Sequence, residues 1–367
     1  MKYLTIVILI AGIVYLTYIR NFAVEYLKPT KVEKTSNIVV QKVALSSSKD
    51  GNTIILDNNG LVWQCSKHIF DENNTEDIAK VNNLENVVEV DAGYSHYLVL
   101  KSDGTVWTWG SNEYGELGDG TNNQRNEPIQ ISNLKNIVKI ACGDFHSMAI
   151  DRDGNIWAWG DNGCGQLGHG DTISKNTPMY VKEVKDITQV KCGVGHTIAL
   201  DKNGFVWTWG FNRTGQLGYE SVNEINTIPQ KIEGLSNIKS IECGAVFSMA
   251  VDNKKCVWSW GYNNNGELGA GSLSIDGIAR IGVFEQISMI SCGIDHSVLV
   301  LKNGEMQGWG NNKNGQLGIK MSYQGRDQIM PKPIKIRNIN NVMLANANNG
   351  ITVVIKNDGS LWYLKSQ

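Results

Sequence analysis

Short hydrophobic runs separated by polar turns occupy most of the chain. The runs are rich in β-branched and aromatic residues, and Gly, Asn and Asp lie between them. This pattern is typical of β-strands joined by tight turns, and the runs show no helical period. One stretch illustrates the spacing, with strands predicted near Pro128 to Ile131, Asn136 to Cys142, His146 to Ile150 and Asn155 to Gly160. An all-β fold is therefore expected.

The same stretch recurs along the chain as a repeat. Its clearest copy runs from Gly193 to Gly218, and closely similar copies begin at Gly93, Gly143 and Gly293. A fifth copy carries Phe247 where the others have histidine, and Lys255 where most have a turn glycine. The period is marked by equivalent residues 44 to 55 positions apart, namely Trp63, Trp107, Trp157, Trp207, Trp258, Gln307 and Trp362. Seven units of about 50 residues, each with four short strands, predict a seven-bladed β-propeller.

Prolines mark the fourth strand of a unit and show how the ring closes. Five of them precede a β-branched residue by three positions and an Asn or Asp by eight, namely Pro29, Pro128, Pro178, Pro229 and Pro333. Proline suits the start of an edge strand, where its missing N–H is not needed. The last unit stops soon after Trp362 and lacks a fourth strand, whereas the chain opens with a spare one over Pro29 to Glu33. The two ends of the chain are expected to share one blade, which removes both open edges.

The first twenty residues differ from the repeats. Between Lys2 and Arg20, residues 3–19 carry no charge, and no small-x-small cleavage pattern follows them. Such a stretch predicts one N-terminal hydrophobic helix that enters the membrane as a signal anchor, with a cleaved signal peptide as the alternative. The predicted organisation is residues 1–20 as anchor or signal peptide, 21–27 as linker and 28–367 as propeller. The expected location is the cell membrane, single-pass, with the propeller extracytoplasmic, or secreted if the segment is cleaved.

Charge and cysteine content argue against several functions. The chain has 34 basic and 36 acidic residues, for a net charge of −2, and no basic run. This balance is poor for phosphate-backbone binding, so no nucleic-acid partner is expected. The seven cysteines form no Cys-x-x-Cys pair, and four of them repeat directly before the blade glycines. They are interpreted as small buried hydrophobic residues, with no zinc or redox motif.

Histidines and tryptophans, which are candidates for metal-binding or catalytic roles, also recur at equivalent positions of the repeat. The histidines occupy one position in four units, namely His96, His146, His196 and His296, and none has a second ligand at short spacing. A structural role is predicted for them, in hydrogen bonds to the backbone of their own blade, and no metal. The first tryptophans Trp107, Trp157, Trp207 and Trp258 are predicted to pack between blades. The acidic pairs lie in Asp-Gly turns. No catalytic residue and no cofactor are predicted, so the protein is not expected to be an enzyme.

The repeat resembles that of the regulator of chromosome condensation family. Residues 142–170 read CGDFHSMAIDRDGNIWAWGDNGCGQLGHG, close to the family signature, and the match extends over about residues 28–367. The resemblance implies a seven-bladed propeller but no single activity, because function in propellers lies in the loops. The family includes guanine-nucleotide exchange factors for small GTPases and secreted bacterial inhibitors of beta-lactamases. The predicted anchor indicates a bacterial-type, membrane-anchored member.

Positions that vary between units point to a binding surface. They are the two residues between blade glycine and histidine and the residue after each Trp-Gly. In a four-stranded blade these loops emerge on one side of the disc, and aromatic residues there are typical interface anchors. The predicted partner-binding residues are Tyr94, Phe145, Phe211 and Tyr262. The expected function is a monomeric, non-enzymatic propeller that binds a protein partner at a membrane. The alternatives are guanine-nucleotide exchange on a small GTPase and inhibition of beta-lactamase-like enzymes.

Overall fold

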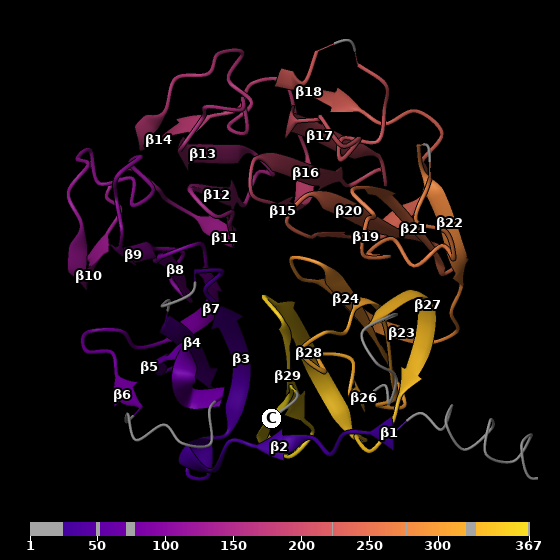
Figure 1. Ribbon diagram of the computed structural model, residues 1–367. Helices are drawn as coiled ribbons and strands as arrows, with labels where there is room; N and C mark the ends of the chain where they lie inside the picture. Colours follow the sequence, from indigo (N-terminus) through magenta and orange to yellow (C-terminus); the bar gives the residue numbers. More distant parts are fainter. Residues whose placement is uncertain are drawn as a thin grey trace, which may run out of the picture.

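The chain forms a closed ring of seven antiparallel four-stranded sheets around a central axis, which confirms the predicted propeller (Figure 1). A computed structural model describes residues 25–48, 52–70, 78–221, 223–275, 277–320 and 328–365. Blades one to six begin in turn with β3, β7, β11, β15, β19 and β23, and blade seven begins with β28.

Within each blade the first strand lines the axis and the second strand pairs with it. The first strands are β3 (Val40–Leu45), β7 (Val87–Ala92), β11 (Ile137–Cys142), β15 (Ile187–Cys192), β19 (Ile238–Cys243), β23 (Ile287–Cys292) and β28 (Val342–Asn348). The second strands are β4 (Asn52–Asp57), β8 (His96–Lys101), β12 (His146–Asp151), β16 (His196–Asp201), β20 (Phe247–Asp252), β24 (His296–Leu301) and β29 (Ile351–Lys356).

The third and fourth strands lie further out. The third strands are β5 (Val62–Ser66), β9 (Val106–Gly110), β13 (Ile156–Gly160), β17 (Val206–Phe211), β21 (Cys256–Gly261), β25 (Met306–Asn311) and β30 (Leu361–Leu364). The outer strands are β6 (Ala79–Lys80), β10 (Arg125–Gln130), β14 (Lys175–Tyr180), β18 (Ile225–Lys231), β22 (Ala279–Val283), β27 (Ile329–Ile336) and β2 (Thr30–Lys31). Of two short 3-10 helices, η1 (Glu33–Thr35) precedes the first blade and η2 (Lys67–Phe70) lies between its third and outer strands.

The hydrophobic core is divided among the contacts between neighbouring blades. The second strands are buried over most of their length, because another blade covers each of their faces. At one such contact, Met148 and Leu167 of blade three pack with Val190 and Trp209 of blade four. Both faces of a strand therefore need apolar residues, which explains why these runs read as continuous hydrophobic stretches. No blade buries its core alone, so stability depends on the ring.

The turn between the second and third strands has the predicted backbone geometry. Gly154 has a φ of 78°, and the Asp151 carboxylate accepts hydrogen bonds from the N–H groups of Asp153 and Asn155, at 3.0 Å each. In blade five the equivalent residue is Lys255, with a φ of 62°. A left-handed conformation costs a residue with a side chain about 1 kcal/mol relative to glycine. The fifth copy therefore keeps the turn despite its altered sequence.

The ring closes where the chain's two ends meet, as the repeat pattern predicted. Strand β2 pairs antiparallel with β30, with Thr30 opposite Tyr363 and Lys31 opposite Trp362. The Val32 N–H also donates to the Leu361 carbonyl at 2.9 Å, and the Val32 side chain is buried. The strand is shorter than the predicted Pro29 to Glu33, because η1 begins at Glu33. In Figure 1 this junction lies at the lower edge of the ring.

A second N-terminal contact was not anticipated from the sequence. Residues 21–27 were expected to form a linker, but β1 (Glu25–Tyr26) pairs with β26 (Ile319–Lys320), a short strand in blade six. The Arg337 guanidinium stacks over the Tyr26 ring at 4.9 Å. The hydrophobic helix predicted over residues 3–19 lies outside the described residues. Within the described part of the chain, no helix is both long and apolar enough to cross a membrane.

We expect removal of residues 1–34 to destabilise the ring more than removal of residues 1–27. The longer deletion removes β2 and exposes an unpaired edge of β30, whereas the shorter one removes only the β1–β26 pair. Thermal unfolding and sedimentation of both variants measure the difference. Equal melting temperatures, with both variants monomeric, would show that β2 does not close the ring.

Candidate interaction face and central channel

The histidines join each blade to the next. His146 Nε2 of blade three lies 3.2 Å from Thr197 Oγ1 of blade four. That hydroxyl donates to the Gln166 carbonyl at 2.9 Å, and the Trp209 indole N–H donates to the same oxygen at 2.8 Å. The Gln166 carbonyl belongs to blade three, so one blade supplies the histidine and the acceptor while the next supplies the hydroxyl and the indole. We call this arrangement the inter-blade clasp.

The inter-blade clasp recurs around the ring. The other histidine–hydroxyl pairs are His96 with Ser147, His196 with Ser248 and His296 with Thr352, each at 3.0 Å. The sequence suggested hydrogen bonds to the histidine's own blade, but the partner in every case lies in the next blade. The reason is that these side chains project from the face of their own sheet toward the neighbouring sheet. Blade five carries the buried Phe247 at this position and lacks the histidine contact.

Burial keeps His96, His146 and His196 of the inter-blade clasp neutral. The hydroxyl donates to a carbonyl, so it must accept from the imidazole, which places the proton on Nε2. The Nδ1 atoms of His96, His146 and His196 are buried with no hydrogen-bond partner. Desolvation lowers the pKa of His96 and His196 to about 4, and desolvation together with the neighbouring histidines lowers the pKa of His146 to about 3. Among the described residues, no group of three or more His, Cys, Asp or Glu could hold a metal ion.

The third strands have two tryptophan positions with different roles, and both are occupied in β9, β13, β17 and β21. The second one is fully buried and completes the inter-blade clasp, as Trp159, Trp209, Trp260 and Trp309 do. The first one is half-buried, and the Trp157 indole N–H donates to Asp151 Oδ2 of its own turn at 3.2 Å. The equivalent donors and acceptors are Trp107 with Thr105, Trp207 with Asp201 and Trp258 with Asp252. Turn carboxylates therefore orient indoles and are held within the framework.

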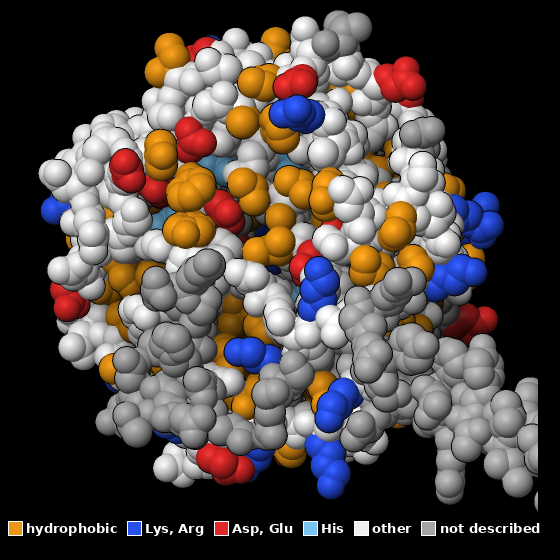
Figure 2. Space-filling model, in the orientation of Figure 1, with side chains coloured by type: hydrophobic (Ala, Val, Ile, Leu, Met, Phe, Trp, Pro, Cys, Tyr) orange, Lys and Arg blue, Asp and Glu red, His pale blue; other side chains and the backbone are white. Residues whose placement is uncertain are grey.

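The predicted binding residues lie on the face that carries the connections between first and second strands and between third and fourth strands. We call it the loop face and the opposite side the turn face. Tyr94 and Phe145 are in contact, with ring centroids 5.2 Å apart, and Phe145 also meets Tyr114 at 5.5 Å. Tyr94 and Tyr114 are each 40% exposed. Figure 2 looks onto this face and shows hydrophobic side chains gathered around its centre.

The four predicted residues do not form one continuous arc of ring contacts. Phe211 and Tyr262 are half-buried, and the Tyr262 hydroxyl accepts a hydrogen bond from the Asn264 amide at 2.9 Å. Instead, Tyr114 joins the pair formed by Tyr94 and Phe145. The sequence contained a signal for Tyr114, because sister units carry Cys164, Thr214, Asn265 or Asn314 at the same position. We define Tyr94, Tyr114 and Phe145 as the aromatic cluster.

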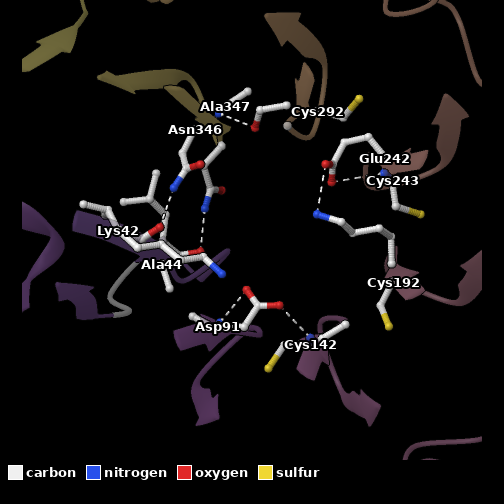
Figure 3. Close-up of a pocket in the computed structure, with 18 of the residues that line it drawn as sticks. Lys42, Ala44, Asp91, Cys142, Cys192, Glu242, Cys243, Cys292, Asn346 and Ala347 are labelled. Carbon is white, nitrogen blue, oxygen red and sulfur yellow. Dashed lines mark hydrogen bonds and ion pairs between the residues drawn. The ribbon is translucent and has the colours of Figure 1, made fainter. Parts of the chain in front are cut away.

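A central channel of about 910 Å³ runs between the first strands, and the repeat analysis did not identify it. Its charged groups are paired within the wall (Figure 3). Lys191 Nζ lies 3.0 Å from Glu242 Oε2, and the Asp91 carboxylate accepts N–H bonds from Cys142 at 2.9 Å and Ala92 at 3.0 Å. Charged residues within first strands, such as Glu89, Asp91 and Lys191, were the available signal.

The repeated cysteines contribute little reactivity to the channel wall. Cys142, Cys192, Cys243 and Cys292 are all free thiols, and the Cys243 sulfur lies 3.1 Å from His196 Nε2. Desolvation by burial is the main cause that raises the pKa of all four thiols. A raised pKa leaves little thiolate at neutral pH, and thiolate is the reactive form. These residues therefore fill space beside the inter-blade clasp.

We expect His146→Ala to lower the free energy of unfolding by about 1–3 kcal/mol, the range for a lost buried hydrogen bond. In a double-mutant cycle with Thr197→Val, the two losses should be less than additive, because both substitutions break one contact. Chemical denaturation measures all four variants. Stoichiometric zinc in the purified protein that His146→Ala abolishes would contradict this structural role.

We also expect the free energy of unfolding to decrease as pH falls from 6.5 to 5. The unfolded histidines bind protons below their ordinary pKa of 6.5, whereas His96, His146 and His196 stay neutral in the fold until about pH 4 or 3. Each contributes about 1.4 kcal/mol per pH unit in this range. His146→Phe, which copies Phe247 of blade five, should reduce the slope by one such increment. An unchanged slope in urea titrations would show that His146 already takes up a proton in the fold.

Comparisons with known proteins agree with this geometry. Human WBSCR16 superposes with a TM-score of 0.72 at 20% identity, over 89% of this chain and 87% of that one. Prp20p of Saccharomyces cerevisiae gives a TM-score of 0.70 at 21% identity, over 89% and 83% of the two chains. A model of the regulator of chromosome condensation (RCC1) repeat matches residues 287–316, and a model described as the RCC1-like domain matches residues 22–278. Because the latter match covers more than half of the chain, this protein belongs to the RCC1-like domain family.

Proposed function

We propose that this propeller is a non-enzymatic module that binds a protein partner through its loop face. The observation that supports the proposal best is the aromatic cluster. Large rings are in contact there on an exposed surface, at positions where the repeat does not require them. Sister blades carry Val194 and Ile294 in place of Tyr94, so the framework accepts other side chains. Exposed aromatic residues grouped in this way are typical of protein interfaces.

The absence of a catalytic role is part of the proposal. The carboxylates that resemble acid–base pairs orient turn N–H groups and indoles, as Asp151 does for Asn155 and Trp157. The four histidines of the inter-blade clasp are buried at 0% exposure and bonded between blades, so they cannot reach a substrate. Both residue types therefore have structural tasks that explain their presence. We propose that the protein acts as a monomer.

We further propose that the protein is a bacterial-type member displayed at a membrane. The support is the uncharged stretch over residues 3–19 in the sequence. Five residues separate that stretch from β1, which begins at Glu25. An extended chain spans at most about 3.6 Å per residue, so these residues would hold β1 within about 18 Å of the membrane. Display at that distance would favour partners that are themselves near the membrane.

Guanine-nucleotide exchange on a small GTPase is the second candidate. It is favoured by the likeness to Prp20p, a yeast RCC1 protein described by its binding to Gsp1p and histones. The loop face would then contact the GTPase. Release of a fluorescent guanine nucleotide from purified GTPases, with and without the propeller, separates exchange from binding alone.

We expect a photoreactive benzoylphenylalanine at Tyr94 to crosslink a partner in cells that express the full chain. The same photoreactive residue at Val88, which lies in the channel wall at the turn-face end of β7 and is 51% exposed, should give no such product. Adding Phe145→Ser should reduce crosslinking from position 94 about tenfold, equivalent to about 1.4 kcal/mol of binding free energy. The melting temperature should change little. Equal crosslinking from both faces, or from Val88 alone, would contradict the proposal.

A further inference from the structure

We propose that the aromatic cluster and the carboxylates around it form a receptor for a basic segment of the partner, one that presents lysine or arginine side chains. This inference rests on the proposed function and gives the partner a chemical class. The receptor lies on the loop face over blades two and three. Its carboxylates are the exposed Glu113 and the half-buried Asp144 and Asp161, with the buried Glu116 directly beneath the surface.

The carboxylates belong to the same loops as the residues of the aromatic cluster. Glu113 and Glu116 flank Tyr114 in the same loop, and Glu116 Oε2 accepts the Tyr114 N–H at 2.9 Å. Asp144 precedes Phe145, and the Asp161 N–H donates to the Phe145 carbonyl at 2.8 Å. Figure 2 shows acidic side chains among the hydrophobic ones in this part of the face. Rings and negative charges therefore share one surface.

The acidic groups of this surface lack basic partners among the described residues. From the described residues, the Asp144 carboxylate accepts one hydrogen bond, from the Ser47 hydroxyl at 2.7 Å. Burial raises the pKa of Asp144, and burial together with the charges of Glu113 and Asp161 raises the pKa of Glu116. No ion pair in the described part of the chain reaches any of the four carboxylates.

Carboxylates further out in the same loops are paired instead. Asp119 binds Arg125 at 2.6 Å, and Asp171 binds Lys175 at 3.1 Å. In blade four, Glu224 lies 3.8 Å from Arg213. The loops thus contain basic residues, but these neutralise the periphery and leave the aromatic cluster acidic. A partner's cation is the group that this surface lacks.

The chemistry of the surface selects among possible occupants. Lysine and arginine heads bind the faces of tyrosine and phenylalanine rings by cation–π attraction, and nearby carboxylates add direct ion pairs. Phosphate-bearing occupants, such as nucleic acid or an anionic lipid surface, would be repelled by the same charges. A neutral apolar partner would leave the buried carboxylates without compensation. A basic protein segment therefore fits best.

The test uses the detergent-solubilised full chain and a fluorescent peptide of alternating arginine and glycine, with a glutamate–glycine peptide for comparison. We expect only the basic peptide to bind, measured by fluorescence anisotropy. Binding should weaken steadily between about 50 and about 500 mM NaCl, because salt screens exposed charges. Glu113→Gln combined with Asp161→Asn should weaken binding on the order of fivefold, and Tyr114→Ser should also weaken it.

A matched pair of substitutions on the turn face provides the control. Asp153→Asn combined with Glu233→Gln removes the same charge from exposed sites and should leave peptide binding unchanged. Equal weakening by this control would show general charge attraction and overturn the inference. Full binding by the Glu113→Gln/Asp161→Asn variant would overturn it as well. If crosslinks at position 94 persist in that case, the loop face binds a partner without the charges, and only the inference fails. Absence of crosslinks at position 94 means instead that the proposed function fails.

Discussion

In each of blades two to five, one main-chain carbonyl oxygen accepts the hydrogen bonds that hold the next blade in place. In blade three it belongs to Gln166, and it receives both an indole N–H and a hydroxyl from blade four. The hydroxyl in turn accepts from His146 of blade three, so every polar group of the contact is used except the histidine Nδ1. Buried polar groups that are nearly all satisfied fix one relative position of two sheets, whereas apolar packing alone tolerates sliding. The spacing of the blades therefore follows from this contact.

Blade five shows how far the ring can depart from that contact. Phe247 replaces the histidine and is completely buried, next to Gly244, where a Cβ would lie 2.1 Å from the ring. The contact to blade six keeps the Trp309 indole and the Ser297 hydroxyl, which both donate to the Glu267 carbonyl. The phenylalanine supplies apolar area in place of one hydrogen bond. The contact between blades six and seven shows the reverse loss, because it keeps His296 and the Thr352 hydroxyl but has Leu364 where the indole would be. The hydroxyl and its carbonyl acceptor are thus the part that all of these contacts share.

The sequence was sufficient to predict the architecture, because each structural requirement recurs in most of the units. Turn glycines, tryptophans and the proline of the outer strand could be compared across copies, and the exchange of ends followed from a missing strand. Contacts between units were harder to predict. A hydroxyl in one repeat and a histidine in the previous one are some fifty positions apart, and nothing in a single copy links them. The pairing of β1 with β26 falls outside the repeat altogether, so no comparison between units could have revealed it.

The candidate site was predicted in part for the same reason. Variable loop positions identified Tyr94 and Phe145, because their sister residues differ in kind. Their contact with Tyr114, and the half-buried state of Phe211 and Tyr262, depend on how loops of adjacent blades approach one another. The channel depends on which first-strand side chains face the axis after the sheets twist. Such distances arise only when the ring is assembled.

The two N-terminal strands have a mechanical consequence. Strand β1 is held by blade six and β2 by blade seven, so the chain entering the ring is fixed at two successive points. Tension applied to the N-terminus would act on the two-residue β1–β26 pair first. Force would reach the β2–β30 pair, which closes the ring, only after β1 and β26 separate. Separation of the short β1–β26 pair would then absorb small forces before they reach the β2–β30 pair that closes the ring. A propeller tethered by this end could turn and sway on its tether while its seven blades stay joined.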